Sequence, residues 1–180
     1  GEKDSGATTS GMMGYAGLTY RPVLDMPRGL SPYVRASCYY LSGDDGENGR
    51  DNRDTGWDPL WARWPQDSEM LVYGPLYGLG YWSNLIYPAV TIGVDSKVRH
   101  RFKCYAGPMF CAEDDGYGGG DSSYQGMLAV ARYDFPLRTA GKNERFDISG
   151  HVMGEVLQPG DYYITDKTAY FVRWEIVVRF

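Results

Sequence analysis

The chain has 180 residues, a net charge of −5, 43% hydrophobic residues and 15% aromatic residues. This length suits one ordinary domain or a small barrel, and the acidic balance argues against a nucleic-acid binder. No apolar run approaches the ~18 residues of a membrane-spanning helix, which excludes a helical span. A membrane β-barrel remains allowed, because its strands alternate in polarity and never form continuous apolar runs.

The N-terminal part predicts a polar start followed by two strands. Residues 1–10 are small and polar and indicate a flexible start or a cut point within a longer protein. Strands are predicted at Met12–Val23 and Pro32–Ser42, with a turn rich in Pro and Gly between them. In the second strand, Arg35 lies on the opposite face from Val34 and Ala36.

Residues 43–69 are the most irregular stretch and predict a long loop. The first half is rich in Gly, Asp and Asn, and its carboxylates do not fit an EF-hand pattern, so no metal site is predicted. Three tryptophans in the second half are costly to leave in water, so we expect this half to fold back onto the barrel or into its mouth. The predicted gating residues of this loop are Trp57, Trp61, Arg63 and Trp64.

The rest of the chain predicts strands separated by loops, without any helical period. Pro75 ends the predicted strand Met70–Leu76. Residues 114–123 predict a flexible loop. The predicted strands are Met70–Leu76, Leu85–Asp95, Arg99–Glu113, Tyr124–Phe135, Arg145–Leu157 and Thr168–Phe180.

The last strand, Thr168–Phe180, has the clearest alternation. One face carries Tyr170, Val172, Trp174, Ile176, Val178 and Phe180, and the other carries Arg173, Glu175 and Arg179. A strand of a soluble sandwich could alternate in the same way. Aromatic residues that bracket the apolar face favour a membrane barrel instead. The terminal Phe180 resembles the assembly signal of bacterial outer-membrane β-barrels, which implies the barrel-assembly machinery as a partner.

Together these segments predict a single all-β domain over residues 1–180. About eight strands of ~10 residues match the length needed to cross a bilayer at a tilt. Because lipid cannot satisfy an open sheet edge, such strands must close. The predicted fold is an antiparallel transmembrane β-barrel in contact with outer-membrane lipid.

Four segments resemble the C-terminal half of the alginate-export porin family: residues 42–45 (SGDD), 57–73 (WDPLWARWPQDSEMLVY), 151–163 (HVMGEVLQPGDYY) and 169–180 (AYFVRWEIVVRF). The resemblance implies a Gram-negative outer-membrane barrel that passes an anionic oligosaccharide or a small solute. Family members are considerably longer than this chain. The last strand therefore closes either against Met12–Val23, as a small barrel without a channel, or against a strand outside this chain.

The predicted inner faces collect both signs of charge. Arginines there could pair with sugar carboxylates while acidic residues prevent tight trapping; alternatively, the charges form ion pairs that only satisfy one another. The predicted solute path consists of Arg35, Arg101, Lys103, Arg132, Arg145, Asp147, His151, Glu155, Arg173 and Glu175.

Three functions are compatible with these patterns: a channel, a small structural or adhesive barrel, and a barrel-resident hydrolase. A ligand-binding barrel outside the membrane is the fallback. An enzyme is not predicted, since any catalytic triad would need His151 and no Gly-x-Ser-x-Gly motif occurs. The three cysteines, Cys38, Cys104 and Cys111, lack metal-ligand spacing, and no cofactor is predicted.

The strand count raises a conflict over loop 43–69. Counting back from a periplasmic C-terminus places this loop on the periplasmic side, where connections are normally short. Either a strand near residues 70–85 is miscounted, or the loop folds into the lumen as a constriction.

Overall fold

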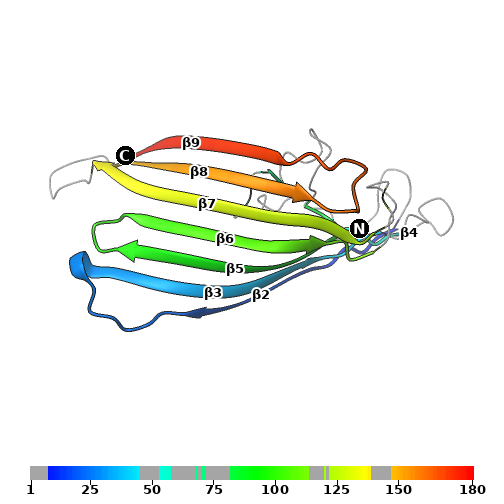
Figure 1. Cartoon of the computed structure of the whole chain (residues 1–180), viewed down its shortest axis with the longest axis horizontal. Helices are drawn as coiled ribbons and strands as arrows, with labels where there is room; N and C mark the ends of the chain where they lie inside the picture. Colours follow the sequence, from blue (N-terminus) through cyan, green and yellow to red (C-terminus); the bar gives the residue numbers. More distant parts are fainter. Residues whose placement is uncertain are drawn as a thin grey trace.

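The computed structural model describes residues 8–44, 53–57, 68, 70–71, 82–113, 120, 122–138 and 147–180. Seven strands form one antiparallel sheet in which each strand lies beside the next along the chain (Figure 1). The strands are β2 (Met13–Tyr20), β3 (Leu30–Leu41), β5 (Leu85–Ser96), β6 (Arg101–Phe110), β7 (Tyr124–Arg138), β8 (Asp147–Pro159) and β9 (Ala169–Arg179). Two short segments, β1 (Thr8–Thr9) and β4 (Arg53–Asp54), pair separately in parallel.

The all-β antiparallel fold is confirmed, whereas the sheet is open rather than closed. Strands β2 and β9 are its two edges and do not pair with each other. The predicted strand Met70–Leu76 is wrong at its two described residues, since Met70 and Leu71 are helical. The described sheet therefore has seven strands where the sequence pattern predicted about eight.

The connections divide between the two ends of the sheet. Residues 21–29, 97–100 and 139–146 join strands at the end where β9 finishes, which we call the turn end. Residues 42–84, 111–123 and 160–168 join strands at the opposite end, which we call the loop end (Figure 1). Because β3 pairs directly with β5, no strand of the described sheet lies between residues 41 and 85 in the sequence. The count that gave loop 43–69 to the side of the C-terminus included Met70–Leu76 as a strand, so the order of the sheet supports the miscounted strand among the two explanations.

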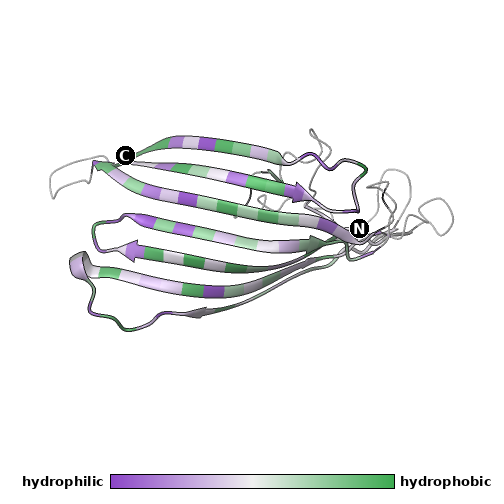
Figure 2. Cartoon of the chain, in the orientation of Figure 1, coloured by the Kyte–Doolittle hydropathy of each residue, from purple (hydrophilic) through white to green (hydrophobic). Residues whose placement is uncertain are grey.

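The two faces of the sheet differ sharply in polarity. Hydrophobic and hydrophilic residues alternate along the strands (Figure 2), so each face receives every second side chain. On the outer face of β9, Tyr170 and Val172 are each 74% exposed and Trp174 is 73% exposed. On the inner face of β7, Leu128 and Val130 are almost fully buried. The outer face is therefore apolar although it is exposed, which inverts the usual arrangement of a sheet in water.

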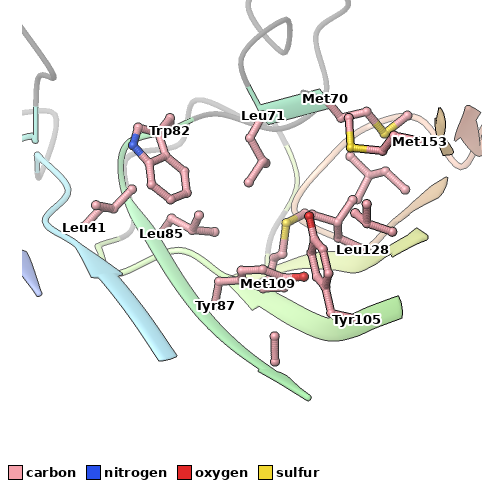
Figure 3. Close-up of a cluster of buried hydrophobic side chains, with 13 residues drawn as sticks. Leu41, Met70, Leu71, Trp82, Leu85, Tyr87, Tyr105, Met109, Leu128 and Met153 are labelled. Atoms are coloured by element: carbon pink, nitrogen blue, oxygen red, sulfur yellow. The ribbon is translucent and has the colours of Figure 1, made fainter. Parts of the chain in front are cut away.

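A compact hydrophobic core covers the inner face near the loop end (Figure 3). The sheet contributes Leu41, Leu85, Met109, Leu128 and Leu157, each with no exposed surface. Connection 42–84 covers them with Met70, Leu71 and Trp82, all buried. One half of the inner face is therefore filled by side chains, and the other half is left to the charged residues.

Asn84 ties two long connections together at the loop end. It is 6% exposed and adopts a left-handed backbone with φ of 46°. Its side-chain oxygen accepts hydrogen bonds from the backbone N–H groups of Ala112 and Glu113, both at 2.8 Å. Its amide nitrogen donates to the Glu113 carbonyl at 2.9 Å, and its own carbonyl accepts from Gln125 Nε2 at 2.9 Å.

We expect Asn84→Ala to lower the free energy of unfolding by about 2–4 kcal/mol, because three side-chain hydrogen bonds are lost and alanine is strained at positive φ. Asn84→Gly loses the same bonds without the strain, so it should cost ~1 kcal/mol less. Denaturant unfolding of both variants measures the difference. Equal costs would show that the backbone conformation is not strained.

Candidate functional site

The turn-end half of the inner face holds an open hollow of about 690 Å³. Its walls come from β3, β5, β6, β7, β8, β9 and the adjoining turns, so most of the sheet contributes to it. The polar lining residues are Arg21, Tyr33, Asp95, Arg99, Arg101, Lys103, Arg132, Asp134, Ser149, His151, Glu175 and Arg179. The described inner face thus combines an apolar, filled half with a charged, open half.

Two cross-strand rows carry most of the charge in the hollow. The first row crosses the sheet from β5 to β9, and each of its residues lies directly opposite the next: Asp95, Arg101, Asp134, His151 and Glu175. No two like charges are neighbours in this row. In the second row, Lys103 lies directly opposite Arg132. Like charges placed opposite each other repel, so this row is favourable only where anions neutralise it.

Neighbouring acids neutralise part of the positive charge. Arg132 binds Asp134 at 2.6 Å, and Arg173 forms an ion pair with Glu175 two residues along β9. Six cationic residues line the hollow but only three carboxylates do, which leaves an excess of three positive charges in a chain whose net charge is −5. Within the described part of the chain, Arg101 and Arg179 form no ion pair. A concave positive surface of this kind concentrates anions.

Arg99 closes one side of the hollow at the turn end. It lies in the β5–β6 turn, and its guanidinium binds both carboxylate oxygens of Asp147, at 2.8 and 2.6 Å. Asp147 begins β8, so the pair reaches past β6 and β7. The hydrogen bond to Asp147, and then its negative charge, raise the pKa of Arg99, which stays a cation. Asp147 therefore acts as a structural partner at the rim rather than as a lining residue.

Arginine and tyrosine side chains alternate on the inner face of β2 and β3. Arg21 lies over the Tyr33 ring at 4.4 Å, and Arg35 lies over the Tyr15 ring at 5.4 Å. The Tyr15 ring is 4.4 Å from the Tyr39 ring, which continues the row toward the loop end. Alternation along β3 places Arg35 and Tyr39 on one face, because they are an even number of residues apart. The roles of Tyr15 and Tyr33 were missed, although their inward positions follow from the same period of two.

Glu155 lies away from the hollow, within the apolar half of the inner face. Its side chain is buried and accepts hydrogen bonds from the Ser68 hydroxyl at 2.6 Å and from the Met70 backbone N–H at 3.2 Å. Ser68 Oγ in turn accepts from the Leu71 N–H at 3.3 Å, as a helix N-cap does. Glu155 was predicted to line a solute path. In the structure it anchors Ser68, Met70 and Leu71, which we call the inward segment, to β8.

The other predicted residues divide into three groups. Trp57 is half-buried against the apolar core, and its carbonyl accepts from the Ser83 hydroxyl at 2.7 Å. Phe180 is fully exposed at the turn end. Four predicted residues lie outside the described part of the chain: Trp61, Arg63, Trp64 and Arg145.

In the described ranges, no group of three or more His, Cys, Asp or Glu residues is arranged to hold a metal ion. Among the same residues, no helix is long and apolar enough to cross a membrane. Comparison with known proteins found no matching family model, no matching curated protein and no matching solved structure. The resemblance to alginate-export porins therefore stays a prediction.

Proposed function

We propose that this chain forms part of the wall of a bacterial outer-membrane β-barrel channel for anionic, sugar-like solutes, similar to the alginate-export porins. The observation that carries the proposal is the exposed apolar outer face of the sheet. Apolar side chains are exposed along the outer face, while charged side chains share the inner face with the core. Exposure of such an apolar outer face to water is unfavourable, whereas contact with lipid stabilises it.

Two aromatic rows support a membrane position for the outer face. Near the turn end, Phe102, Tyr133 and Trp174 belong to one cross-strand row and are at least 41% exposed. Near the loop end, Phe110 and Tyr124 are paired, and their rings are 5.6 Å apart. The eight residue steps from Phe102 to Phe110 span ~27 Å along the strand and ~21 Å in height at a tilt of ~40°. This height is close to the apolar band of outer-membrane barrels, which aromatic girdles flank.

The asymmetry of the connections supports an orientation. Outer-membrane barrels have short periplasmic turns and longer extracellular loops. The β5–β6 turn spans only residues 97–100, whereas the β3–β5 connection spans residues 42–84. We therefore place the turn end and Phe180 on the periplasmic side.

The charged hollow supports anionic solutes over cationic ones. Arginine guanidinium groups bind carboxylates in a bidentate manner, and Arg101 and Arg179 are without an ion pair among the described residues. The carboxylates of Asp134 and Glu175 already neutralise Arg132 and Arg173, which keeps solute binding weak enough for release.

The filled half of the inner face favours a second candidate, a small non-conducting barrel with a structural or adhesive role. Met70, Leu71 and Trp82 occupy the space beside the sheet, and a barrel of about eight strands has an interior that side chains alone fill. The channel proposal requires a wider barrel in which this segment forms a constriction.

Ion selectivity in planar bilayers tests the channel function. For the closed barrel of which this chain forms part of the wall, we expect an anion-selective conductance whose reversal potential shifts toward cation selectivity in the double variant Lys103→Glu/Arg132→Glu. Lys167→Glu is the matched control, because Lys167 is exposed in the 160–168 connection at the loop end. A closed barrel that inserts without conducting would favour the structural role. An equal shift in the control would mean that the hollow does not determine selectivity.

A further inference from the structure

The two edges of the sheet run in the same direction. Every neighbouring pair from β2 to β9 is antiparallel, so the chain direction reverses at each of the six steps. Both β2 and β9 consequently run from the loop end to the turn end (Figure 1). A direct pair between them would have to be parallel.

Both edges also belong to the apolar outer surface. Leu18 and Tyr20 on β2 are 78% and 69% exposed, and Val172 and Trp174 on β9 are 74% and 73% exposed. In lipid, each unpaired N–H or C=O group along such an edge costs several kcal/mol. Neither edge can therefore stay open in a membrane, and single-chain bacterial outer-membrane barrels close with even numbers of antiparallel strands.

We propose that β2 and β9 bind the two outer strands of a block that contains an odd number of further membrane-crossing strands. This inference rests on the proposed membrane function. The strand beside β9 and the strand beside β2 both run from the turn end to the loop end, and both place apolar side chains outward. On the inner face, Arg179 has no ion pair among the described residues, so an acidic residue of the strand beside β9 would complement it. The described seven-stranded sheet is thus a wall segment that cannot close on itself with antiparallel pairing.

Strand parity can be tested by extending the chain beyond Phe180. One variant carries a copy of residues 147–159 after an Asn-Gly turn, which adds one strand antiparallel to β9. A second variant carries a copy of residues 147–179, which adds two strands and restores an odd total. Both are compared with the unextended chain in lipid vesicles, with Cys38, Cys104 and Cys111 replaced by alanine.

Closure is read out by bismaleimide crosslinking between Leu18→Cys on β2 and a cysteine on the outer face of the last strand. This second cysteine is Val172→Cys in the unextended chain, and it replaces the copied Val156 or the copied Val172 in the two extended chains. The positive control is Val152→Cys/Trp174→Cys, because these residues are direct partners in β8 and β9. We expect monomeric crosslinked product only in the variant with one added strand, at an efficiency similar to the control pair.

Two results would overturn the proposal. Crosslinking within a monomer of the unextended chain, at the efficiency of the control, would show that β2 and β9 close in parallel. Closure of the two-strand variant as efficient as that of the one-strand variant would show that parity does not matter. If none of the chains enters vesicles while the control pair still crosslinks, the membrane function itself fails, and the inference falls with it.

Discussion

Replacing Val172 by arginine is expected to destabilise the protein by about 2–4 kcal/mol in a lipid bilayer, the cost of an arginine near the midplane of a barrel's lipid face. Val172 lies on the outer face of β9, between the two aromatic rows, and is 74% exposed. In water, an arginine at so exposed a position would change the free energy of unfolding by no more than ~0.5 kcal/mol. The cost of this substitution therefore distinguishes a lipid-facing surface from a water-facing one. The exposed fraction of the Val172 side chain is the same in both cases and cannot distinguish them.

Two matched variants make this test specific to depth. Val178→Arg lies closer to the turn end on the same face of β9, and its cost should fall to ~0–1 kcal/mol near the interface. Ile164→Arg lies in the 160–168 connection at 87% exposure and should be neutral in both environments. Reversible unfolding from vesicles by urea, followed by tryptophan fluorescence, gives all three values. A Val172→Arg cost no larger than that of Ile164→Arg would rule out a lipid-facing β9.

Replacing Glu155 by alanine is the second substitution with a large expected effect. It leaves the Ser68 hydroxyl and the Met70 N–H in an apolar surrounding without their acceptor, at a cost of about 1–3 kcal/mol for each group. Release of the inward segment should follow, because Glu155 is its polar anchor on β8. In a conducting channel, single-channel conductance should then increase together with the loss of stability.

The control for Glu155→Ala is Met153→Ala. Met153 points to the same face of β8 and is buried in the same core, but its loss removes only packing. A double-mutant cycle of Ser68→Ala with Glu155→Gln should show a coupling of about 1 kcal/mol. If Met153→Ala raises conductance as much as Glu155→Ala does, packing rather than the hydrogen bonds holds the segment in place.

The period of two determined which face each side chain occupies, and the sequence alone was enough to show it. The outward position of Val172 and the inward position of Arg173 follow from alternation, because successive side chains on a strand point to opposite faces. The facing of β7 was ambiguous from the pattern. The structure places Met127 and Tyr133 outward, since both are over 40% exposed while Leu128 has no exposed surface.

The sequence could not determine the strand count between residues 70 and 84, and the position of the long loop depended on that count. A short apolar stretch such as Met70–Leu71 is compatible with either a strand or one helical turn. The outcome depended on Glu155, which lies 85 residues away from Met70 and accepts its N–H. A capped helical turn on the inner face was favoured over a strand by this contact.

The division of the inner face also required the tertiary structure. Alternation predicted that Glu155 and Arg132 would line one path, because both belong to inward faces of the predicted barrel. Which cations have an acidic partner does not follow from alternation: Asp134 lies opposite Arg101 on β6, yet it forms its ion pair with Arg132 two residues along β7. A shift of one residue would exchange the faces of an entire strand, so alternation reveals the faces but not the partners. The sequence by itself thus determined the two faces of the sheet; pairing and long-range contacts alone decided the open hollow, the filled half and the direction of the edges.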